Sequence, residues 1–170
     1  MLKAVQESGR RATANARFAI VASRYNHQYV DPMLRAAQAE LKRAGAKGVK
    51  TVRVPGAFEI PLVAAHLARV GSGAGEAATG FSAIICLGVI LRGETVHAAH
   101  IGENVSRALM DIQLRQEVPI IHEVLLLEDQ MQARARCLSK THNRGAEAAQ
   151  TALVMAEVMR TLLGSRRSDR

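Results

Sequence analysis

Four short apolar runs alternate with longer amphipathic segments along this chain, and this order limits the available folds more than any other feature. The runs cover residues 17–23, 49–54, 81–91 and 118–127 and are rich in Val, Ile and Leu. Their length and composition favour strands, and the segments between them carry apolar residues at helical spacing. Strict alternation is typical of a parallel sheet with helices on both faces. The sequence therefore predicts an α/β protein.

Helix signals mark the intervening segments. Asp31 and Pro32 favour the start of the first helix, and Gly45 favours its end. A Gly- and Ala-rich stretch at 71–80 is typical of a connection within one domain. Helices are expected over 29–45, 58–71, 98–116, 128–140 and 145–164.

Composition narrows the class of protein. The 170 residues include 48% hydrophobic residues but no run long enough to span a membrane, and no secretory signal stands at the N-terminus. We therefore expect one domain in the cytoplasm, with Cys86 and Cys137 reduced. The net charge of +8 attracts phosphates, yet only 3% of residues are aromatic and no dense basic stripe occurs. Nucleic acid and membrane are therefore not expected partners.

Function is expected where the strands end, because ligands of open parallel sheets bind beyond the carboxyl ends of the strands. Tyr25 follows the first run, and its ring suits either stacking on a planar ligand or covering the end of a helix. After the second run, "VPGAFEIP" places a Pro55-Gly56 turn before a helix start. Its free N–H groups and Glu59 suit a polar heterocycle, or Glu59 is simply a first-turn acid.

The third run ends in "RGETVH", residues 92–97. Gly93 allows close backbone approach, Thr95 has a hydroxyl and His97 has an imidazole, which suits proton transfer beside a phosphate. A structural histidine is the alternative. His100 and Glu103 follow at helical spacing, but the cysteines of a zinc site and the residues that would orient its ligands are not evident, so no metal is predicted.

Two further features remain. His122 and Glu123 interrupt the fourth apolar run, as polar residues at functional sites do. Four basic residues then stand within eleven positions, where an arginine fork could hold a phosphate or the run could form a solvated helix face. They are Arg134, Arg136, Lys140 and Arg144.

Taken together, "VPGAFEIP", "LGVILRGETVH" and "KTHNRGAEAA" resemble the lumazine synthase family, over roughly residues 17–160. The resemblance implies a flavodoxin-like three-layer α/β/α sandwich with a four-stranded parallel sheet. It implies a transferase of riboflavin biosynthesis that condenses 5-amino-6-(D-ribitylamino)uracil with 3,4-dihydroxy-2-butanone 4-phosphate, without a cofactor. The product is 6,7-dimethyl-8-ribityllumazine, with phosphate and water released.

The resemblance also implies residue roles. His97 falls on the proton-transfer histidine, and the phosphate falls to Glu94, Thr95 and Arg136. The pyrimidine and ribityl positions are Tyr25, Ala57, Phe58, Glu59, Val89, Ile90, Leu91 and His122. Tyr25 stands in place of the usual Phe, His122 in place of an apolar aromatic and Glu123 in place of a small residue.

Members of this family assemble as pentamers, some of which build sixty-subunit shells, with active sites between neighbouring subunits. The resemblance therefore implies a homo-oligomer in which Arg136 and His122 serve an adjacent site, and riboflavin synthase is an open candidate partner. We divide the chain into an N-terminal arm (1–16), a synthase-like domain (17–163) and a basic tail (164–170). Two alternatives stay open: a non-catalytic flavin- or lumazine-binding protein, and a structural shell protein.

Overall fold

The computed structural model describes residues 12, 16–70, 80–93 and 96–168, and a parallel sheet forms its centre. The strands are β1 (Phe18–Ser23), β2 (Val49–Val54), β3 (Ala83–Leu91) and β4 (Ile120–Leu127). They lie in the order β2-β1-β3-β4, and every pair is parallel. Each strand lies within two residues of the expected bounds, so the prediction of a four-stranded parallel sheet is confirmed.

The apolar content of each strand follows its place in the sheet. Every residue of β1 is buried, and so is every residue of β3 except Leu91, because both strands have neighbours on each side and helices above and below. The edge strand β2 carries exposed residues such as Lys50 and Thr51. The other edge strand, β4, carries the polar pair His122 and Glu123 on its two opposite faces.

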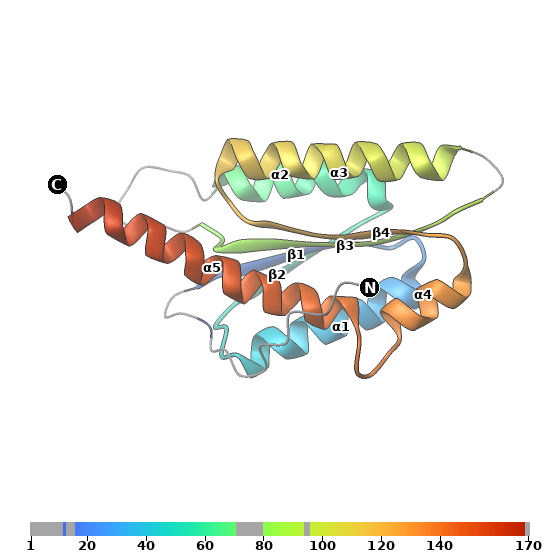
Figure 1. The fold of residues 1–170 in the computed structure, drawn as a ribbon, viewed down its shortest axis with the longest axis horizontal. Coiled ribbons are helices and arrows are strands. Elements are labelled where there is room, and N and C mark those ends of the chain that lie inside the picture. Colours follow the sequence, from blue (N-terminus) through green and yellow to red (C-terminus); the bar gives the residue numbers. More distant parts are fainter. Residues whose placement is uncertain (1–11, 13–15, 71–79, 94–95, 169–170) are drawn as a thin grey trace.

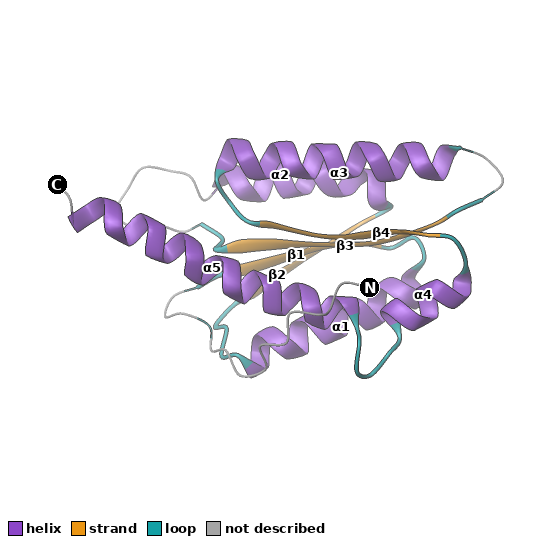
Figure 2. Ribbon diagram, viewed as in Figure 1, coloured by secondary structure: helices purple, strands orange, loops and turns teal. Residues whose placement is uncertain are grey.

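Helices cover both faces of the sheet, as Figures 1 and 2 show. On one face lie α2 (Ile60–Val70) and α3 (His97–Gln116), and on the other lie α1 (His27–Arg43), α4 (Gln130–Cys137) and α5 (Arg144–Ser168). Each face has its own apolar core: Ile60, Leu67 and Leu109 pack on the first, and Phe18, Met33 and Leu41 on the second. The three layers confirm the predicted flavodoxin-like sandwich.

Some boundaries differ from expectation. The second predicted helix begins as a short 3-10 turn, η1 (Ala57–Glu59), before α2. The first helix begins at His27, before the Asp31-Pro32 pair, so Pro32 lies inside the helix and does not mark its start. Helix α5 continues to Ser168, so part of the expected basic tail is helical. The expected arm at 1–16 and the connection at 71–80 lie almost wholly outside the described residues.

Close packing fixes the start of α5 against α1. A Cβ atom added to Gly145 would stand 1.9 Å from the backbone oxygen of Met33, so only glycine fits this crossing. Cys137 lies buried nearby, and Cys86 is buried in β3; both are free thiols. Burial raises the pKa of the Cys137 thiol to about 11, which suits an unreactive packing residue. No helix in the described ranges is both long and apolar enough to span a bilayer.

Candidate active site

A cavity of about 690 Å³ opens at the carboxyl ends of β1, β2 and β3. Eight of the residues predicted from the sequence line it: Tyr25, Ala57, Phe58, Glu59, Val89, Ile90, Leu91 and His97. The sequence reasoning did not assign a site role to Ile101 and Asn104 of α3, which also line the cavity. His100, which we considered from the sequence only as a candidate metal ligand, lines it too.

Asn26 joins two of the strand ends. It adopts a left-handed backbone conformation, with φ 56°, which asparagine tolerates better than most residues. Its side-chain amide donates a hydrogen bond of 2.8 Å to the backbone oxygen of Val89 at the end of β3. The neighbouring backbone N–H of Tyr25 donates to the oxygen of Pro55, at 2.9 Å. The turns after β1, β2 and β3 are therefore held in one relative position.

Two aromatic side chains are exposed at the cavity. Tyr25 is 73% exposed and Phe58 is 62% exposed, which is unusual in a chain so poor in aromatic residues. Large apolar side chains left open beside a concave surface are typical of ligand sites. A flat ligand in this cavity could contact both rings.

Glu59 turns its carboxylate back on its own turn. The backbone N–H of Gly56 donates to Glu59 Oε2 at 2.8 Å, so this side chain closes the start of η1. The carboxylate of Glu59 therefore behaves as an ordinary acid in the first turn of a helix, which was the second of the two interpretations of this residue. The backbone N–H groups of the 57–59 segment stand at a helix start.

His97 opens α3 on the rim of the cavity and is exposed. Gly93 also lines the cavity and has open space where a Cβ would stand. Glu94 and Thr95, which we predicted to meet a phosphate, lie outside the described residues. Within the described ranges, no group of three or more His, Cys, Asp or Glu side chains could hold a metal ion.

The remaining two predicted residues, His122 and Arg136, do not line this cavity. His122 lies exposed on the edge strand β4, where its Nε2 stands 2.8 Å from the hydroxyl oxygen of Ser106 on α3. Arg136 lies exposed on α4, in the layer on the opposite face of the sheet from α2 and α3. A single chain therefore does not bring them together with His97.

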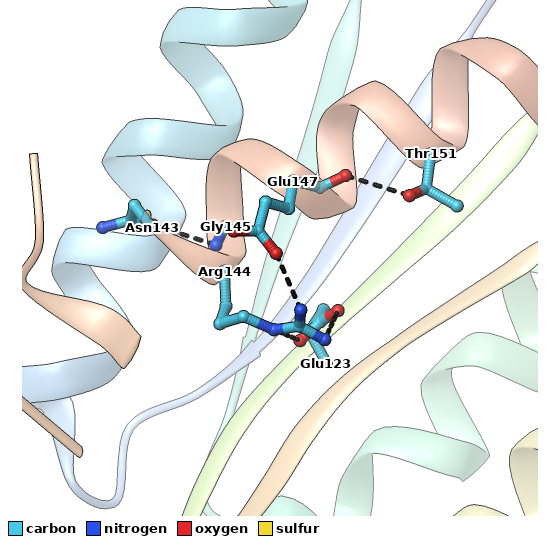
Figure 3. A network of polar contacts seen from close by, with 6 residues as sticks. All are labelled: Glu123, Asn143, Arg144, Gly145, Glu147 and Thr151. Atoms are coloured by element: carbon cyan, nitrogen blue, oxygen red, sulfur yellow. Dashed lines mark hydrogen bonds and ion pairs between the residues drawn. The ribbon is translucent and has the colours of Figure 1, made fainter. Parts of the chain in front are cut away.

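A charged network beside β4 joins this strand to the start of α5 (Figure 3). Arg144 donates two hydrogen bonds to Glu123, of 3.0 and 2.8 Å, and a third to Glu147 at 2.7 Å. Asn143 accepts from the N–H of Gly145 at 2.9 Å and donates to the oxygen of Cys137 at 2.6 Å, which closes the loop between α4 and α5.

This network distinguishes two arginines of the basic run that the sequence could not tell apart. Arg144 is paired with two carboxylates, whereas Arg136 is exposed. Glu123 is only 7% exposed, and this burial raises the pKa of its carboxyl group to about 7 against the opposing charge of Arg144. Glu123 is therefore a structural partner of Arg144 on the face of β4 opposite to His122.

Comparison with known proteins agrees with this geometry. A sequence profile of the family described as 6,7-dimethyl-8-ribityllumazine synthase matches residues 15–160. The 6,7-dimethyl-8-ribityllumazine synthase of Stenotrophomonas maltophilia (strain R551-3) is 37% identical over 158 residues, which cover 92% of this chain and 97% of the relative. This chain belongs to the 6,7-dimethyl-8-ribityllumazine synthase family.

Proposed function

We propose that this chain catalyses the reaction of its family, a transferase reaction of riboflavin biosynthesis. It condenses 5-amino-6-(D-ribitylamino)uracil with 3,4-dihydroxy-2-butanone 4-phosphate to 6,7-dimethyl-8-ribityllumazine, releasing phosphate and water. The observation that carries the proposal is the single cavity that gathers Tyr25, the 56–59 turn, the end of β3 and His97, in a member of this family. No observation within the described residues favours a non-catalytic binding protein or a shell without activity.

The residues at the cavity fit the chemistry. The amine of the pyrimidine attacks the ketone and water leaves to give an imine; phosphate is then eliminated, and ring closure releases a second water. Each step moves a proton, and His97 on the cavity rim is the side chain we assign to that transfer. The cavity contributes further by holding two substrates side by side, which converts a bimolecular reaction into an effectively unimolecular one.

The pyrimidine binds among the residues at the strand ends in this proposal. The ring stacks on Tyr25 and contacts Phe58, both of which leave their side chains exposed at the cavity. Backbone groups of Ala57, Glu59 and the end of β3, from Val89 to Leu91, hold its polar edge and the ribityl chain. Glu94 and Thr95 meet the phosphate in this proposal, and they contribute through the backbone and the Thr95 hydroxyl.

Arg136 and His122 complete the cavity of a neighbouring subunit in our proposal. Both are exposed, and both lie away from the cavity of their own chain. A homo-oligomer of five or more subunits, located in the cytoplasm, would place Arg136 at the phosphate and His122 at the pyrimidine of the adjacent site. The same proposal treats residues 1–16 as an N-terminal arm that precedes the synthase-like domain. It also names riboflavin synthase as a partner protein.

The direct test uses protein sized by light scattering and supplied with both substrates. We expect stoichiometric release of phosphate together with the absorbance and fluorescence of the lumazine. Omission of the phosphorylated ketone provides the control, because neither signal should then exceed the uncatalysed background. Absence of both signals above background, from a folded oligomer, would contradict the proposed function.

A further inference from the structure

Ser106 and His122 form a polar contact between α3 and the edge strand β4. The Ser106 hydroxyl oxygen stands 2.8 Å from His122 Nε2 and also 2.8 Å from the backbone oxygen of Gly102, one helical turn earlier. Both distances are those of well-formed hydrogen bonds. The serine thus touches two possible acceptors with a single hydroxyl proton.

The single hydroxyl proton of Ser106 determines which atom donates in each of its two hydrogen bonds. Two oxygen atoms at 2.8 Å repel one another unless a proton lies between them, so the Ser106 hydroxyl donates to Gly102. The same oxygen then accepts from His122, which requires a hydrogen on Nε2. In the neutral ring Nδ1 therefore carries no hydrogen and is a hydrogen-bond acceptor.

We infer that Ser106 is a positioning residue that fixes His122 in the Nε2–H tautomer, so that Nδ1 accepts a hydrogen bond from an N–H group of the pyrimidine substrate. This inference rests on the proposed function, which places His122 at the site of the adjacent subunit. The Ser106 contact also holds the ring in one orientation, and a preset ring loses less freedom when the ligand binds.

The ligand chemistry matches the acceptor. A uracil ring carries N–H donors on its edge, and a buried donor without a partner weakens binding. The opposite tautomer would direct an N–H of histidine at an N–H of the substrate, which leaves both unpaired. An apolar ring at this position would offer contact area but no acceptor. Ser106 and His122 together therefore determine a preference for a pyrimidine with a free ring N–H.

The tautomer is tested first, without substrate. Solid-state NMR of the sedimented, assembled protein labelled with ¹⁵N-histidine reports the protonation of each ring nitrogen, and His122→Phe identifies the signals of this ring among the six histidines. At a pH where the ring is neutral, we expect a protonated Nε2 and an unprotonated Nδ1, and a mixture of tautomers in Ser106→Ala. A protonated Nδ1 with a bare Nε2 in the unaltered protein would overturn the inference.

Binding of the pyrimidine substrate alone, measured by calorimetry, tests the consequence. Loss of one neutral hydrogen bond should weaken binding about three- to tenfold in Ser106→Ala and raise KM for the pyrimidine with little change in kcat. Ser106→Thr keeps the hydroxyl and should bind as the unaltered protein does. Thr161→Ala removes a comparable hydroxyl bond, from an exposed residue of α5 to the Glu157 oxygen, and is the matched control.

A double variant tests whether Ser106 affects pyrimidine binding only through His122. Ser106→Ala should change nothing further in a His122→Phe background, because the serine acts only through the histidine. Equal losses in both backgrounds would overturn the positioning role. Failure of the proposed function is distinguishable: it would appear as no turnover in the unaltered protein, while the NMR result on the tautomer would be unaffected.

Discussion

The cavity at the ends of β1, β2 and β3 and the edge formed by β4, α4 and α5 are held together by different forces. Around the cavity, neutral hydrogen bonds join one turn to the next, as Asn26 does to Val89 and Tyr25 to Pro55. Along the β4 edge, ion pairs join the elements, because Arg144 of α5 pairs with Glu123 of β4 and with Glu147 of α5. The bonds that join one cavity turn to the next should therefore depend little on pH and salt, although the Glu59 carboxylate closes one of these turns, whereas the β4 edge should respond to pH.

The comparison also separates two kinds of contribution to catalysis. The cavity holds the proton-transfer candidate His97 and the pyrimidine surface in one chain. The β4 edge carries Arg136 and His122, which do not line that cavity and in our proposal serve a neighbour. Substitutions in the cavity should therefore act within a subunit, and those at the edge should act across an interface.

His97→Ala should have the largest effect on rate. Positioned acid–base groups contribute about 10²- to 10⁴-fold, so kcat should fall by at least about 100-fold while binding of the pyrimidine alone stays nearly unchanged. Steady-state kinetics and calorimetry measure the two quantities. His66→Ala, an exposed histidine on α2 outside the cavity, is the control. An equal loss of binding and rate would assign His97 to substrate holding instead.

The buried carboxylate of Glu123 should make stability depend on pH. Its folded pKa of about 7 exceeds the unfolded value of 4.5, so its contribution to stability is full below about pH 4.5 and is lost as the pH rises through about 7. The free energy of unfolding of the unaltered protein, measured relative to that of Glu123→Gln, should fall over this range by up to roughly 3 kcal/mol. Chemical denaturation at a series of pH values measures this difference.

Glu157→Gln provides the matched control for that experiment, because Glu157 pairs with Arg160 at an exposed position of α5. Its unfolding free energy should keep a nearly constant offset from the unaltered protein over the same range. A free energy of unfolding that rises with pH in the unaltered protein, relative to Glu123→Gln, would contradict the account. It would mean that attraction by Arg144 outweighs the cost of burying the charge.

Arg136→Ala should act chiefly on the phosphorylated substrate. Hydrogen bonds from an arginine to a phosphate contribute about 1.5 to 3 kcal/mol, so KM for the ketone phosphate should rise about 10- to 100-fold. Use of the pyrimidine should change little. Arg134→Ala, on the same exposed helix, controls for a general loss of positive charge. Equal effects of the two variants would show that the field of the basic helix, and not one fork, attracts the phosphate.

Tyr25→Ala should have the smallest of these effects. Stacking of an aromatic pair contributes about 0.5 to 1.5 kcal/mol beyond burial, which corresponds to pyrimidine binding weakened by about three- to tenfold. Tyr25→Phe keeps the ring and should bind normally. Titration of the pyrimidine by calorimetry measures both, and a loss in Tyr25→Phe would show that the phenol group, not the ring face, holds the ligand.

The sequence predicted the layers of this fold because burial on both sides leaves a simple pattern. The central strands read as unbroken apolar runs, and each ended within two residues of its expected bound. Eight of the predicted site residues lie at one cavity because parallel strands share a carboxyl edge. Asn104 and Ile101 were missed, since pocket-lining positions on a helix face have no local sequence signal.

The charged residues were harder to place. Glu123 broke an apolar run and Arg144 sat in a basic run, and nothing local in the sequence joins positions 21 residues apart. Only the approach of β4 to the start of α5 makes them partners. The helix start at His27 was misjudged for a similar reason, because the left-handed Asn26 is held by a distant bond to Val89.

The division of the site between subunits is tested most directly by mixing inactive variants. His97→Ala and Arg136→Ala chains are refolded together and assayed at a low concentration of the phosphorylated ketone. If each site takes Arg136 from a neighbour, random mixing restores both groups at about one quarter of the sites, and activity should recover to that fraction of the unaltered protein. Activity no greater than the sum of the two separately refolded variants would contradict a shared site.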